Sequence, residues 1–90
     1  MRVAREYVVT GRVQGVGFRY FTQAAAARAA VCGWVTNLPD GRVAIVAEGA
    51  AEALERFERE IHHGPPGAIV DHVEVRQAAP DARRTGFSIR

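Results

Sequence analysis

The chain has 90 residues, of which 48% are hydrophobic and 24% charged, and its formal net charge is +2. This length allows one domain, residues 1–90, with a modest core. Lysine is absent, and the twelve arginines are scattered rather than gathered into the basic stripe typical of nucleic-acid-binding proteins.

The single cysteine, Cys32, excludes an intrachain disulfide and is expected to be a small buried hydrophobe. With no apolar run long enough for a membrane span or a signal peptide, we expect a cytoplasmic monomer that binds neither membranes nor nucleic acid.

The first third of the sequence predicts a strand followed by a helix. Residues 5–13 alternate between apolar and other side chains, as in a half-buried strand. A glycine-rich connection then leads to an alanine-rich stretch from Phe18 or Phe21 to Val31. Alanine is the best helix former, so this stretch predicts a helix. Gly33 is expected to cap the end of that helix.

The remaining elements are indicated by periodicity and by turn residues. They are a strand over 34–38, a strand over 42–48, a helix that ends before Gly64, a strand over 69–77 and a short strand over 87–90. Pro39-Asp40-Gly41 supplies the hairpin turn between the first two of these strands. The resulting order, β-α-β-β-α-β, predicts an α+β, ferredoxin-like fold. Its antiparallel sheet would carry two helices on one face and a short extra C-terminal strand.

Two local details are also expected in this second part. Gly49 would be the N-cap of the second helix, with Glu52 three residues further on. In the strand over 69–77, Ile69, Val73 and Val75 would point into the core.

The most informative segment is GRVQGVGFR at residues 11–19, where three glycines lie between the first strand and the first helix. Glycine lets the backbone turn sharply and bring its N–H groups close to a bound group. A helix N-terminus adds further free donors and a positive dipole, which favour an anion. Arg19 adds a permanent cation with a planar set of donors. The segment therefore predicts a phosphate-binding loop.

Other glycine-rich loops fit this segment less well. A Walker A loop needs a lysine, which the chain lacks. A dinucleotide-binding fingerprint that starts at Gly15 fails because Tyr20 stands where its third glycine should be, and the chain is too short for the doubly wound sheet. A tight turn without a ligand stays open as an alternative, although Arg19 at the start of the helix disfavours it.

GRVQGVGFR, together with Gly33-Trp34-Val35-Thr36-Asn37, closely resembles the acylphosphatase family, and the resemblance extends from about Tyr7 to Ile89. It implies a ferredoxin-like fold and hydrolysis of acyl phosphates without a metal or other cofactor. It also implies that Arg19 and Asn37 are the catalytic pair.

The chemistry of the residues agrees with these roles. Backbone N–H groups of Gly15, Val16, Gly17, Phe18 and Arg19 would bind the phosphoryl oxygens, and inorganic phosphate or sulfate could occupy the same loop. Asn37 offers one acceptor and one donor group with which to hold a water molecule. Two alternatives remain: an RNA-binding module, because RNA recognition motifs share the element order, and a non-catalytic domain that binds a phosphorylated metabolite.

Overall fold

A computed structural model describes all of residues 1–90 and contains two helices and five strands. The elements are β1 (Arg2–Arg12), α1 (Phe18–Ala29), β2 (Cys32–Asn37), β3 (Val43–Ala50), α2 (Ala51–His63), β4 (Ile69–Ala78) and β5 (Phe87–Ile89). The predicted order of elements and the ferredoxin-like α+β fold are confirmed. Neither helix is long and apolar enough to cross a bilayer.

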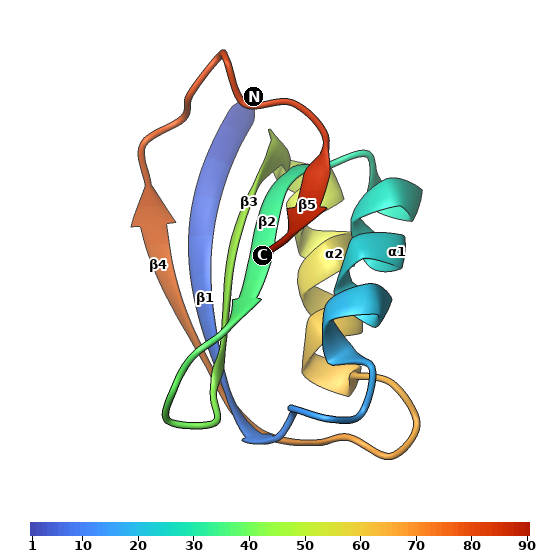
Figure 1. The fold of residues 1–90 in the computed structure, drawn as a ribbon. Helices are drawn as coiled ribbons and strands as arrows, with labels where there is room; N and C mark the ends of the chain where they lie inside the picture. Colours follow the sequence, from blue (N-terminus) through green and yellow to red (C-terminus); the bar gives the residue numbers. More distant parts are fainter.

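The strands form one sheet in the order β4-β1-β3-β2-β5, and both helices cover the same face of it (Figure 1). The first four strands in this order pair antiparallel, as predicted. The predicted short extra strand is β5, which pairs parallel to β2, so the sheet as a whole is mixed. The chain reverses direction between β4 and β5, and β4 runs antiparallel to β1 and β2, so β5 must run in the direction of β2.

The core lies between the sheet and the two helices and contains a cluster of 17 buried residues. Leu54, Phe57 and Ile61 form the fully buried face of α2. Burying a side chain of this size contributes about 1.5–3 kcal/mol. Phe18, the first residue of α1, is also buried in this cluster. The core therefore fixes the start of α1, which is the part of the helix that follows the glycine loop.

Both helices have ends that differ from the predictions. α1 ends at Ala29 and is capped by Ala30, which is left-handed (φ 59°); the N–H groups of Ala30 and Val31 donate to the carbonyls of Ala27 and Ala26, respectively. This is a Schellman motif, and burial of Val31 offsets the cost of a left-handed alanine. Gly33 instead lies within β2, where a Cβ atom would collide with the carbonyl of Val46.

The N-cap of α2 is Ala50, with no side-chain capping bond, rather than Gly49. Gly49 is the last buried residue of β3, because that strand continues directly into the helix.

The inward face of β4 was predicted only in part. Val73 is buried, but Ile69 and Val75 are 52% and 41% exposed. A register irregularity opposite Thr10 and Gly11 turns Val70 rather than Ile69 toward the core. Val75 is exposed because β4 is an edge strand.

A buried carboxylate on the other face of the sheet holds the segment 79–86, which connects β4 to β5 past the N-terminus (Figure 1). Glu48 accepts hydrogen bonds from Arg2 Nε (2.7 Å), Arg84 Nη1 (2.6 Å) and the backbone N–H of Asp81 (2.9 Å). Cys32 lies beside this cluster in β2 and is partly exposed, so the prediction of a buried cysteine is wrong. Its Sγ accepts a hydrogen bond from Arg2 Nη2.

Glu48→Gln is expected to make the melting temperature change less as the pH falls from neutral to acid. The Asp81 N–H and the two arginines hold the pKa of Glu48 below its ordinary value. The ionised carboxylate therefore stabilises the fold at neutral pH, and this contribution is lost as the pH falls through the folded-state pKa. We expect the melting temperature at pH 7 to fall by on the order of 5 °C, and the difference from wild type to shrink below about pH 4.

Thermal unfolding at a series of pH values measures this effect. Glu74→Gln is the matched control, because Glu74 also pairs with an arginine, Arg76, but on an exposed strand. Its melting temperature should stay close to that of the wild type. A difference for Glu48→Gln that stays constant from pH 7 to pH 3 would contradict this account of the cluster.

Candidate active site

The sheet topology brings the glycine loop and Asn37 to the same edge of the sheet. β1 and β2 both pair antiparallel with β3, which lies between them, so they run parallel to each other and their C-terminal ends lie at the same edge of the sheet. The loop leaves β1 after Arg12, and Asn37 is the last residue of β2. Asn37 and Val9 both pair with Val43. Asn37 is therefore level with Val9, three residues before the end of β1 at Arg12.

The loop presents a continuous run of free backbone donors. Gly15 and Gly17 have positive φ values of 75° and 79°, a conformation that other residues adopt only with strain. A Cβ atom at either position would touch nothing, so the backbone conformation alone requires glycine there. The N–H groups of residues 15–20 donate to no protein group. Such a run at a helix N-terminus is suited to bind the oxygens of an anion.

Arg19 lies in the first turn of α1, immediately after this loop. It is partly buried, and its guanidinium makes no ion pair or side-chain hydrogen bond with the protein. The first turn of α1 also holds no acidic residue and no side-chain cap. The positive end of the helix and the arginine charge are therefore not neutralised within the chain, which is the condition an anion site requires.

Asn37 carries an orphaned polar atom. Its Oδ1 is buried and has no hydrogen-bond partner in the protein. A buried acceptor without a partner costs about 1–3 kcal/mol, so folds retain few of them, often at functional sites. Asn37 therefore carries an acceptor that the protein leaves unsatisfied at the sheet edge where the loop begins.

Gln14 ties the loop to the hairpin that follows Asn37. Its Nε2 donates to the backbone carbonyls of Leu38 (2.8 Å) and Arg42 (2.9 Å). These two residues close the β2–β3 turn, which the Leu38 N–H also holds by donating to the Arg42 carbonyl. One side chain thus sets the position of the loop relative to Asn37. Sequence reasoning did not find these partners, because they depend on contacts between segments 24 and 28 residues apart.

The predicted site does not coincide with a hollow of the molecule. The three hollows of the molecule are lined by other residues, so Arg19 and Asn37 line none of them. No group of three or more His, Cys, Asp and Glu side chains stands close enough to hold a metal ion. The structure thus brings the five loop residues and Asn37 to one edge of the sheet, while their roles stay predictions.

Known proteins resemble this chain over nearly its whole length. The profile of the Acylphosphatase family matches residues 5–89. The chain belongs to the acylphosphatase family. An acylphosphatase of Trichormus variabilis is 51% identical over 82 residues, which cover 91% of this chain and 80% of that protein.

Solved acylphosphatases have the same fold. The crystal structure of the Bacillus subtilis acylphosphatase matches with a TM-score of 0.94 at 41% identity, over 100% of this chain and 99% of that one. The Coxiella burnetii acylphosphatase matches with a TM-score of 0.93 at 30% identity, over 99% and 93%.

This acylphosphatase lacks the exposed aromatic residues on its central strands that the RNA-binding alternative requires. RNA recognition motifs stack bases on aromatic side chains of the two central strands. Here the aromatic residue of β1, Tyr7, is fully buried in the core under the helices, and β3 has no aromatic residue. The open face of the central strands therefore offers no stacking platform.

Gln14→Ala is expected to lower acyl phosphate hydrolysis without unfolding the protein. The Leu38 and Arg42 carbonyls each keep one backbone hydrogen bond, so the loss of stability should stay near 1 kcal/mol. Without the Gln14 side chain, the loop would no longer be held at a fixed position relative to Asn37. Misplacement of reacting groups by about 1 Å can cost up to 10²-fold in rate. We expect kcat/KM to fall about tenfold or more.

Gln23→Ala is the matched control for this experiment. Gln23 also donates from Nε2 to a backbone carbonyl, that of Phe87 (3.0 Å), but at the other side of α1 near β5. Its loss should cost similar stability and leave kcat/KM near the wild-type value. Equal activity of Gln14→Ala and Gln23→Ala would rule out the positioning role of Gln14.

Proposed function

We propose that this protein hydrolyses acyl phosphates to a carboxylate and inorganic phosphate, with the phosphoryl group held by residues 15–19 and a water molecule held by Asn37. The observation that carries the proposal is the run of free N–H groups beside an unpaired Arg19, at the same sheet edge as the orphaned Asn37 Oδ1. Membership of the acylphosphatase family supports the same reaction.

The proposed reaction proceeds by displacement at phosphorus. The phosphoryl group has three non-bridging oxygens and about two negative charges, which the loop N–H groups and the Arg19 guanidinium would bind. Water held by Asn37 attacks phosphorus in line with the leaving oxygen, forming a new P–O bond as the bond to the carboxylate oxygen breaks. The products are a carboxylate, inorganic phosphate and one proton. A phosphoryl oxygen of the substrate accepts the proton of the attacking water, so Asn37 need not be a base.

Metal independence is part of the proposal. In many phosphoryl-transfer enzymes a divalent cation neutralises the charge that develops on the phosphoryl oxygens. Here Arg19 and the loop N–H groups would supply that positive potential, and a carboxylate leaves readily without an acid. We also propose a cytoplasmic location, because the only cysteine is a free thiol.

Hydrolysis of acetyl phosphate or benzoyl phosphate in the presence of EDTA tests this function. We expect phosphate release to persist at full rate in EDTA, and p-nitrophenyl phosphate, a monoester with a poorer leaving group, to be hydrolysed far more slowly. In ¹⁸O-labelled water the label should appear in the phosphate. Saturable phosphate binding without hydrolysis would instead identify a sensor domain, and label in the carboxylate would show attack at the carbonyl carbon.

A further inference from the structure

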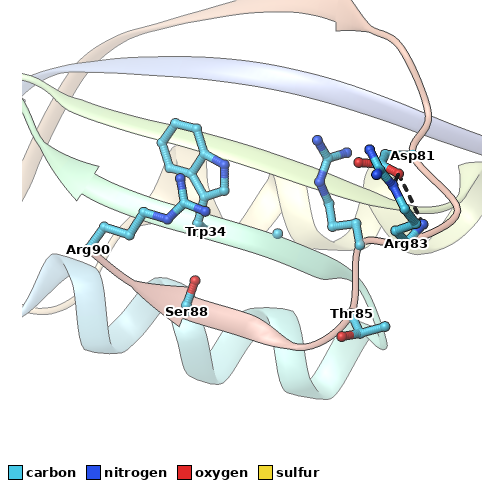
Figure 2. Close-up of a pocket in the computed structure, with 8 residues that line it drawn as sticks. Trp34, Asp81, Arg83, Thr85, Ser88 and Arg90 are labelled. Atoms are coloured by element: carbon cyan, nitrogen blue, oxygen red, sulfur yellow. Dashed lines mark hydrogen bonds and ion pairs between the residues drawn. The ribbon is translucent and has the colours of Figure 1, made fainter.

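A basic hollow lies on the face of the sheet opposite to the helices, between β2, β5 and the segment 79–86 (Figure 2). Its volume is about 450 Å³, within the range of about 300–1,000 Å³ that small-molecule sites occupy. Three arginines line it, against one carboxylate, that of Asp81. It contains none of residues 15–19 and not Asn37, so it is separate from the proposed active site.

The three arginines are held in place by different partners. Arg84 Nη1 donates to the buried Glu48 carboxylate (2.6 Å), and Arg83 Nε donates to Asp81 Oδ1 (3.3 Å). The Arg90 guanidinium stands over the Trp34 ring, 4.8 Å from its centroid. Each guanidinium has five N–H donors, so most remain available to a ligand. The orientation of Arg84 is thus set by the buried Glu48 before a ligand binds, which lowers the entropic cost of binding, whereas the Arg83 side chain is 92% exposed and would be ordered by the ligand.

The Ser88 hydroxyl adds a neutral donor to the same hollow. Ser88 is in register with Trp34 across the β2–β5 pair, so its hydroxyl lies on the face of the sheet that carries the indole. Thr85 lines the hollow from the segment before β5. Figure 2 shows Arg90 and Arg83 at opposite ends of the hollow. A ligand that satisfies both ends must therefore be extended and carry several negative charges.

We propose that this hollow binds a linear polyphosphate, either free or as the phosphate chain of a nucleotide. Arginine is the side chain best suited to pair with phosphate oxygens, because its planar donors bind two oxygens at once. A single phosphate would reach one end of the hollow only, so affinity should increase with the length of the chain. This site does not depend on the proposed hydrolysis.

Fluorescence of Trp34, the only tryptophan of the chain, tests the proposal directly. The wild-type protein is titrated with phosphate, pyrophosphate and tripolyphosphate at constant ionic strength, with sulfate as the control for non-specific anion binding. We expect a saturable change in Trp34 emission, with affinity rising in that order. Titration with ATP, followed by the same Trp34 emission because the proposed active-site loop also binds phosphate, identifies the source of the phosphate chain: tighter binding than tripolyphosphate indicates a nucleotide, and equal or weaker binding indicates the chain alone.

Two variants and a control locate the binding. Arg83→Gln should weaken tripolyphosphate binding about tenfold, as expected for loss of a charge-assisted hydrogen bond. Arg76→Gln removes the same charge from a similar pair with Glu74 on β4, and should bind as the wild type does. Arg19→Ala should also leave this titration unchanged. Equal affinities of Arg83→Gln and wild type, a titration abolished by Arg19→Ala, or an identical response to sulfate would overturn the proposal.

Discussion

Replacement of Arg19 with alanine is expected to lower kcat/KM for acetyl phosphate by on the order of 10³-fold or more, as for other arginines that stabilise a phosphoryl transition state. The reason is that Arg19 is the cation that follows the loop of free N–H groups, and no carboxylate neutralises it. The same absence of partners predicts that unfolding is almost unaffected, within about 0.5 kcal/mol. Steady-state hydrolysis and urea unfolding of the same preparation measure both.

Two further variants make the Arg19 result specific. Arg19→Lys keeps the charge but not the planar donors, so its activity should lie between those of alanine and arginine. Arg12→Ala removes an equal charge at the other side of the loop, where the side chain is exposed, and should change kcat/KM by less than about threefold because of screening. A similar loss in Arg12→Ala and Arg19→Ala would mean that the loop needs only positive potential, not a positioned arginine.

Replacement of Asn37 with alanine should lower kcat by on the order of 10²–10³-fold, the usual cost of losing one positioned hydrogen-bonding group. Stability should stay equal or rise, because the variant removes a buried acceptor that has no partner in the protein. This combination distinguishes a functional asparagine from a structural one. Turnover under saturating substrate and the free energy of unfolding are the two measurements.

Thr36→Ala is the neighbouring control for Asn37. The Thr36 hydroxyl donates to the Arg90 carbonyl at the end of β5, on the other face of the sheet. Its removal should cost some stability and leave kcat near the wild-type value. Activity of Asn37→Ala close to that of the wild type, or a clear loss of its stability, would show that Asn37 serves the hairpin rather than the reaction.

The sequence predicted the fold well where the spacing of apolar residues along the chain matches the residues that the core buries. α2 was clear because Leu54, Phe57 and Ile61 recur at helical spacing and are the residues that the core buries. The predictions failed where a contact between distant segments decides the local structure. Ala30 takes the left-handed cap because Val31 is buried, and the exposure of Ile69 follows from the irregular pairing of β4 with β1.

The candidate site was predictable to the same extent. The glycines before Arg19 indicate a phosphate loop because their chemistry is local, and Asn37 was identified by its resemblance to the family pattern. The orphaned state of its Oδ1, the two hydrogen bonds of Gln14 and the basic hollow around Trp34 all arise from tertiary contacts. No pattern within a single segment could have indicated them.

Inhibition by inorganic phosphate tests most directly whether binding and water positioning are divided between the two residues. The inhibition constant and kcat are measured in EDTA for wild type, Arg19→Ala and Asn37→Ala. We predict that Arg19→Ala weakens phosphate inhibition at least tenfold, through loss of a charge-assisted pair, and that Asn37→Ala leaves it unchanged while kcat falls. Equal phosphate inhibition in wild type and Arg19→Ala, or weakened inhibition in Asn37→Ala with normal kcat, would contradict the account.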